Sequence, residues 1–282
     1  MTFFKFLRSD MKSGVLMQWK KYLITYFIFI VFSIIHYLDI GIINLSNPQY
    51  LINPPTWGDY LLSLVCGSSK FDPSLAGTIF QLPVLWVILF LSVLFITLYY
   101  PYDDLMGWGK TALILSGSRS SWWFSKCIWV IVSVFCYIFT FFAATFTVAS
   151  LSGAELSFRI SEYLPADLGF DNTILISPPW QIGKLLVGFV AVIIALCLIQ
   201  LFLSLLIRPI FSYILVSAYV VASAYFQSPF LLGNYAMAAR SELFVTDNVN
   251  FSSGILICIW SVGISVLIGN LVFGHMDILS KE

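Results

Sequence analysis

The stretch of sequence that decides the fold is Pro101–Lys126, PYDDLMGWGKTALILSGSRSSWWFSK. It follows one apolar run that has no charged residue, Pro73–Tyr102, and precedes a second, Ile128–Ala154. A helix needs about 20 apolar residues to cross the hydrocarbon core of a bilayer, and both runs exceed that length. The charged segment between them must therefore lie outside the lipid, where it joins two membrane-spanning helices.

The rest of the chain repeats this pattern of long apolar runs. Hydrophobic residues make up 60% and charged residues 10% of the sequence, and the mean hydropathy is +0.93. A soluble protein with a very large core is the alternative, but this composition is far from that of soluble domains. We predict an all-α integral membrane protein, a single transmembrane domain over residues 1–282, with six spans. They are expected near residues 22–43, 82–100, 127–150, 184–206, 210–226 and 254–274.

Charges in the connections predict the orientation. With the N-terminus placed in the cytoplasm, ten basic residues fall inside and four outside, as the positive-inside rule requires. Six spans then put both termini in the cytoplasm. The inside bases are Lys5, Arg8, Lys12, Lys20, Lys21, Lys110, Arg119, Lys126, Arg208 and Lys281, and the outside bases are Lys70, Arg159, Lys184 and Arg240.

Segments outside the spans have their own expected structure. Residues 1–21 are typical of an interfacial helix, with Phe4, Leu7 and Met11 on one face beside basic residues that can meet lipid headgroups. A frayed basic tail is the alternative. The three expected extracellular loops cover residues 44–82, 152–183 and 227–253. Within the first of them, Trp57–Val65 is expected to form a short helix at the membrane surface.

The segment 101–126 is too apolar for a free linker. Leu105, Trp108, Ala112 and Leu115 recur at helical spacing and give one face something to dock against. A short amphipathic helix between two spans predicts a contact that transmits force to a soluble partner.

Other functions find little support in the sequence. Ion-coupled transporters usually carry ionisable residues in mid-span, and these spans have none at their centres. Gly109-Lys110-Thr111 imitates the end of a phosphate-binding loop, but Asp104 occupies the position of the first glycine of that motif. No catalytic constellation and no metal-ligand spacing is present. We therefore expect no enzymatic activity, no metal or cofactor bound by this chain and no nucleic-acid partner.

With these features in place, the sequence resembles the membrane subunit of a type-2 ABC exporter. That family has six spans, an N-terminal interfacial helix and a coupling helix after the second span. Its coupling segment typically begins with an acid, which is often Glu, and has Pro before a Ser-Arg pair; here these positions hold Asp103 and Gly117. The topological likeness covers nearly the whole chain, but only Pro101–Lys126 is motif-like. The matching positions are Asp103-Asp104, Gly107, Leu113-Ile114-Leu115, Ser118-Arg119 and Lys126.

This resemblance implies a permease that dimerises with an identical or homologous protomer and pairs with separate ABC ATPase subunits, which would bind ATP and Mg. It also implies the bacterial plasma membrane as the location. Polar docking contacts to the ATPase would come from Asp103, Asp104, Lys110 and Arg119, and the apolar anchor from Trp108 and Leu115. Ordinary solvated charges, or headgroup contacts for Arg119 and Lys126, are the alternative.

The substrate expected of such an exporter is hydrophobic or amphipathic, such as an antimicrobial peptide or a lipid. An apolar path is suggested by four phenylalanines of the third span, although lipid contact or core packing explains them equally well: Phe135, Phe139, Phe142 and Phe146. Two other functions remain open. One is a non-transporting membrane scaffold or sensor with ligand-binding outer loops, and the other is an intramembrane enzyme.

Overall fold

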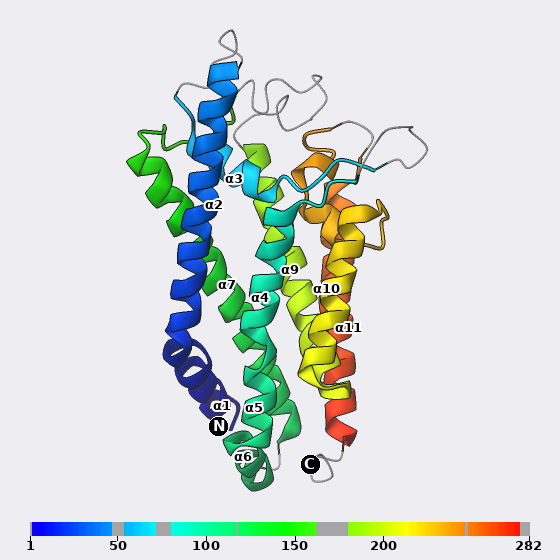
Figure 1. The fold of residues 1–282 in the computed structure, drawn as a ribbon. Helices are drawn as coiled ribbons and strands as arrows, with labels where there is room; N and C mark the ends of the chain where they lie inside the picture. Colours follow the sequence, from blue (N-terminus) through cyan, green and yellow to red (C-terminus); the bar gives the residue numbers. More distant parts are fainter. Residues whose placement is uncertain are drawn as a thin grey trace.

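The computed structural model describes residues 2–46, 54–71, 80–116, 118–161, 180–245 and 248–276. Within these ranges the chain is all-helical and has no strand. Figure 1 shows the long helices lying side by side in one bundle. They are α2 (Trp19–Ser46), α4 (Val84–Leu98), α7 (Arg119–Leu151), α9 (Trp180–Leu206), α10 (Pro209–Tyr225) and α11 (Phe251–His275).

Five stretches of the described chain are long and apolar enough to cross a membrane, which agrees with a multi-pass membrane protein. The helix α10 is also apolar but has only 17 residues. At 1.5 Å per residue it measures about 26 Å, slightly less than the roughly 30 Å of a hydrocarbon core. Helix length and composition therefore support five of the six expected spans as candidates. The five stretches are Phe3–Leu45, Val84–Met106, Arg119–Leu151, Gln181–Leu206 and Phe251–His275.

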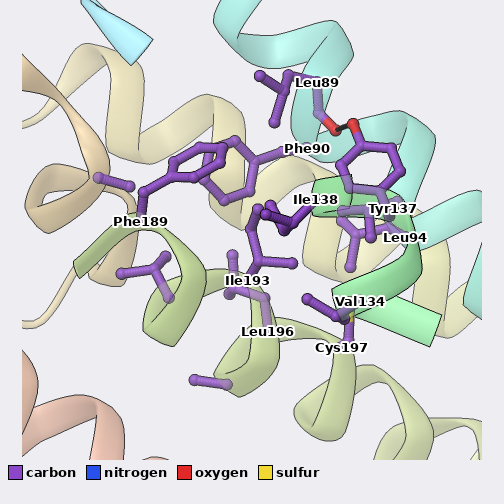
Figure 2. Close-up of a cluster of buried hydrophobic side chains, with 14 of the residues drawn as sticks. Leu89, Phe90, Leu94, Val134, Tyr137, Ile138, Phe189, Ile193, Leu196 and Cys197 are labelled. Carbon is purple, nitrogen blue, oxygen red and sulfur yellow. Dashed lines mark hydrogen bonds between the residues drawn. The ribbon is translucent and has the colours of Figure 1, made fainter. Parts of the chain in front are cut away.

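The centre of the bundle is an apolar cluster where α4, α7 and α9 meet (Figure 2). Phe90 of α4 lies edge-on to Phe189 of α9, with ring centroids 5.5 Å apart. Within this cluster the Tyr137 hydroxyl donates to the backbone oxygen of Leu89 over 2.6 Å. This hydrogen bond satisfies a hydroxyl that would otherwise be buried without a partner.

The N-terminal segment is helical, as predicted, and lies at one end of the bundle, which we call the α6 end (Figure 1). It comprises α1 (Thr2–Asp10), a π-helical turn η1 (Met11–Val15) and a 3₁₀ turn η2 (Leu16–Gln18) before α2. These irregular turns change the direction of the chain, so α1 is tilted against α2 and packs on α7.

The expected coupling helix is two helices, α5 (Tyr100–Met106) and α6 (Trp108–Ser116). Gly107 separates them with a backbone conformation (φ −105°, ψ −124°) that no helix continues. The prediction of one amphipathic face was therefore wrong. Leu105 is buried on α5, whereas Trp108 and Leu115 are exposed on α6.

The opposite end of the bundle, the α3 end, carries the segments that the sequence predicts to be extracellular loops. The short helix expected over Trp57–Val65 is confirmed as α3, but most of its residues are buried in the protein and not laid out on its surface. The 3₁₀ turns η4 (Leu232–Ala236) and η5 (Ala238–Arg240) are buried beside it. Residues 47–53, 72–79, 162–179 and 246–247 of the expected loops lie outside the described residues, as does Lys281.

Candidate partner-docking site at the α6 end

An exposed apolar face lies on α6, the most outlying helix at its end of the bundle (Figure 1). Trp108 is 60% and Leu115 is 83% exposed, which is unusual for such large apolar side chains. Both line an open groove of about 370 Å³ between α6 and α1. The other residues along the groove are Lys5, Phe6, Thr111, Ala112 and Ser116.

Charged side chains lie on the helices that form this groove and on their neighbours. Asp103 is exposed in the middle of α5, and Lys110 is partly exposed on α6. Across the groove, Lys5, Arg8 and Lys12 are exposed on α1 and η1. This end of the bundle therefore combines an exposed apolar face with nearby charged, mainly basic side chains, a combination that is usual in protein interfaces.

A buried ion triad formed by Asp10, Asp104 and Lys126 contacts α6 through Gly109, which packs against Asp104. The Lys126 ammonium forms ion pairs with Asp10 and, over 2.7 Å, with Asp104. The three residues come from α1, α5 and α7, so the triad connects three separate elements at one point. Sequence reasoning placed Lys126 among exposed residues and Asp104 at a partner interface. The structure instead buries Lys126 completely and gives Asp104 an internal partner.

Neighbouring polar groups complete the triad. The Tyr100 hydroxyl donates to Asp10 over 2.8 Å, and the Ser125 hydroxyl also donates to Asp10. The indole Nε1 of Trp122 donates to Asp104 over 2.9 Å. The Lys126 ammonium also lies 4.7 Å from the ring centroid of Tyr100 and 5.1 Å from that of Trp122. Buried charges are tolerated only when paired and hydrogen-bonded in this way, and the aromatic faces add cation–π attraction.

Small residues allow the elements of the triad to come this close. A Cβ on Gly14 of η1 would lie 2.2 Å from the Trp129 Nε1 and 2.7 Å from the Tyr100 ring. A Cβ on Gly109 of α6 would lie 2.4 Å from a carboxylate oxygen of Asp104. Close packing therefore accounts for the glycine that gives Gly109-Lys110-Thr111 its likeness to a phosphate-binding loop.

Arg119 ties the start of α7 to the end of α11. Its guanidinium donates to the backbone oxygens of Gly274, over 3.0 Å, and Met276, over 2.7 Å. A cation at the C-terminal end of a helix satisfies unpaired carbonyl groups and favours the helix dipole. These bonds also fix the C-terminal end of α11 at the α6 end of the bundle.

The four phenylalanines expected to form a substrate path lie on the outward side of α7. Phe135, Phe139 and Phe146 are exposed, and Phe142 is half-buried. Phe142 and Phe146 pack edge-on against Trp57 of α3, with centroids 6.1 and 5.5 Å apart. A path along these rings would therefore follow the boundary between protein and lipid.

A second buried charge, Arg240, lies at the α3 end and was missed by sequence reasoning, which placed it in an outer loop. Its guanidinium donates to the backbone oxygens of Ser223, over 2.6 Å, and Phe226, over 3.0 Å, at the C-terminal end of α10. It also donates to the Asn234 side-chain oxygen over 2.6 Å and to the backbone of Ser68 over 2.9 Å. Burial lowers the pKa of Arg240 to about 10.

Asp59 is the third buried charge and anchors α3. Its carboxylate accepts from the Thr56 backbone in a capping box and from both the backbone and the hydroxyl of Ser161. Burial raises the pKa of Asp59, and these hydrogen bonds oppose the rise. The sequence signal that could have predicted this role of Asp59 is the Thr56-x-x-Asp59 spacing, which resembles a capping box at the start of a helix.

No grouping of His, Cys, Asp and Glu that could hold a metal ion occurs in the part of the chain that the structure describes. The buried charges are satisfied by one another or by backbone and hydroxyl groups. Their arrangement therefore fixes helices in place.

Comparison with known proteins identifies the family to which this chain belongs. No curated protein and no solved structure matches the chain. The family described as "Protein of unknown function (DUF2705)" matches residues 47–279, which is most of the sequence and includes α3 through α11. The chain therefore belongs to the DUF2705 family.

Proposed function

We propose that this chain is the membrane permease subunit of an ATP-driven ABC exporter, docking a separate ATPase through α6. One observation carries the proposal: α6 presents the exposed side chains of Trp108 and Leu115, and its Gly109 packs against Asp104 of the buried ion triad. Exposed aromatic residues at a well-supported position are typical anchors of protein interfaces.

The triad supports a role in transmitting movement. Lys126 joins the α5–α6 segment to α7, and α7 is a 33-residue helix that runs the length of the bundle. A push on α6 would therefore reach α7 and α1 together, because a buried ion pair resists separation more strongly than a surface pair does. ATP and Mg would bind to the partner subunit, since this chain would supply only the coupling surface.

In this proposal α10 is the sixth span, and both termini are cytoplasmic in the bacterial plasma membrane. Three observations favour that orientation. The α1 helix and the end of α11 lie at the same end of the bundle (Figure 1), Arg119 bonds the last turn of α11, and that end carries the exposed bases of α1. A dimer of such subunits would move a hydrophobic or amphipathic substrate.

The experiment is copurification of ABC ATPase subunits from the native membrane with tagged permease variants. Trp108→Ala should weaken the complex by about thirtyfold, because an interface anchor commonly contributes about 2 kcal/mol. Asp103→Lys should weaken it mainly at low salt, since exposed charges are screened. Ile114→Ala is the matched control, because Ile114 is also exposed on α6 but does not line the groove.

Equal recovery of the ATPase with wild type, Trp108→Ala and Ile114→Ala would contradict docking at this groove. If no ATPase binds the wild-type chain, the exporter proposal fails, and a scaffold or sensor becomes the better interpretation.

A further inference from the structure

A lateral apolar groove lies between α10 and α11, away from the α6 site. Both helices pack extensively on α9 and hardly on each other. The gap between them is a groove of about 300 Å³ with α9 as its floor. The floor residues are Leu196, Ile199 and Leu203, the sides are Leu215, Val216, Tyr219, Ile257 and Ser261, and the loop residues Phe230 and Leu232 also line it.

The lining offers nothing to a polar ligand. No charged side chain lines the groove, and its two hydroxyl groups are already used within the protein. The Tyr219 hydroxyl donates to the Phe230 backbone oxygen over 2.6 Å and accepts from the Leu232 amide over 2.9 Å. The Ser261 hydroxyl donates to the Ile257 backbone oxygen over 2.8 Å. A ligand of this groove must therefore be apolar along its length.

We propose that the groove holds one acyl chain of a membrane phospholipid. Two of its three helices, α9 and α11, are long and apolar enough to cross the bilayer, so its mouth opens into hydrocarbon. Leu215 is 54% and Phe230 is 86% exposed at the rim, which shows that the protein itself leaves the mouth open. An empty groove would forfeit dispersion contacts along both its walls, whereas a lipid chain restores them.

The size of the groove favours a lipid chain over a second copy of the protein. A helix with its side chains is about 10–12 Å across. The groove volume of about 300 Å³ would hold only roughly 3–4 Å of such a cylinder, less than one helical turn, whereas a linear alkyl chain is only one methylene group wide. This inference does not depend on an ATPase, so the two proposals can fail separately.

The test is photolabelling of the purified full-length chain in phosphatidylcholine nanodiscs. One acyl chain of the lipid carries a diazirine near its middle, and adducts are located by mass spectrometry after proteolysis. Labelling is expected at Ile199 and Leu203 on the floor, in addition to the exposed faces of the helices. Adducts confined to outward residues such as Leu256 and Trp260, with none on the α9 floor, would overturn the proposal.

Two variants and one matched control separate groove occupancy from general lipid contact. Ser261→Phe places a ring inside the groove, and Leu215→Trp covers its mouth from an exposed position that the fold does not need. Each should abolish the floor adducts while leaving the outward ones. Ile264→Phe is the control, because Ile264 is exposed on α11 but does not line the groove, and it should change nothing.

Retained floor labelling in both groove variants would contradict the proposal. A floor that is unlabelled in the wild type, while Ser261→Cys forms disulfides between copies, would assign the groove to a second protein molecule and would also overturn it.

Discussion

The Lys126 ammonium lies 2.7 Å from the Asp104 carboxylate, and this one ion pair joins the segment between two predicted spans to the span that follows it. Asp10 holds the same ammonium from the other side, so α1 is included in the junction. Two carboxylates and one ammonium leave the triad with a formal charge of −1, which the Tyr100, Ser125 and Trp122 donors stabilise. The α6 end is therefore fixed by electrostatics as well as by apolar packing.

Replacing Lys126 with Met should destabilise the protein by about 3–5 kcal/mol, because two buried carboxylates lose their partner. The measurement is thermal unfolding of the purified chain in detergent micelles. Lys110→Met is the control, since Lys110 is partly exposed and has no ion pair within the described chain. Adding Asp10→Asn and Asp104→Asn to Lys126→Met should recover much of the loss. Equal unfolding temperatures for Lys126→Met and Lys110→Met would show that the triad does not stabilise the fold.

Gly14→Ala should destabilise the junction of α1 and α7 by about 1–3 kcal/mol, the range for overpacking a tight contact. The added methyl would meet the rings of Trp129 and Tyr100, neither of which has room to move in the core. Gly41→Ala in α2 is the matched control, because nothing lies within 4 Å of a Cβ at that position. The measurement is the unfolding temperature of each variant relative to wild type. An equal effect of Gly14→Ala and Gly41→Ala would contradict the close contact at Gly14.

The long helices could be predicted from the sequence because charge-free apolar runs are a strong and local signal. The runs around Leu185–Ile207 and Ile128–Ala154 each became one helix, α9 and α7. The break at Gly107 was harder to predict, because the spacing of Leu105, Trp108, Ala112 and Leu115 fits a continuous helix. Because the helix breaks at Gly107, Leu105 is buried in the protein and Trp108 is exposed on its surface.

The triad itself could not be predicted, because its members are distant in the sequence. Asp10 and Lys126 lie 116 positions apart, and a single sequence gives no measure of which distant charges meet. The only local signals were an acid among the bases of residues 1–21 and a lysine following two tryptophans. The burial of Arg240 could not be predicted either, since many of its partners are backbone carbonyl groups, which every sequence provides.

Arg240→Gln should destabilise the α3 end by at least about 3 kcal/mol, because hydrogen bonds to a charged donor are worth roughly 1.5–3 kcal/mol each and several are lost. Arg240→Lys should recover part of this, since it keeps the charge at the end of α10 but offers fewer donors. Thermal unfolding gives the comparison. Arg159→Gln, at an exposed position, should change stability by less than about 0.5 kcal/mol. A loss no larger for Arg240→Gln than for Arg159→Gln would contradict the anchoring role.

Asp59 should make stability depend on pH in an unusual direction. Its pKa is raised by burial in the folded state, so the folded protein binds more protons than the unfolded one between the ordinary and the raised pKa. Stability from this group is therefore present at acid pH and lost as the pH rises through the raised value. The measurement is the unfolding temperature of wild type minus that of Asp59→Asn, which should increase as the pH falls from 7 toward 4. A difference that is constant, or that decreases on acidification, would contradict the raised pKa.

The last prediction concerns orientation and the sixth span. Single cysteines are introduced into a variant without native cysteines, at exposed positions of known place in the fold: Glu155, Glu242, Arg208 and Ser120. If α10 crosses the bilayer, Arg208 at its start and Glu242 beyond its end lie on opposite sides, although 17 helical residues span only about 26 Å. An impermeant maleimide added to intact cells should therefore label the cysteines at Glu155 and Glu242 and not those at Arg208 and Ser120. All four should react after the cells are opened, which controls for local accessibility.

Labelling of the cysteines at both Arg208 and Glu242 from outside would mean that α10 turns back within the membrane. The chain would then have five spans, its termini would lie on opposite sides, and the permease architecture would fail.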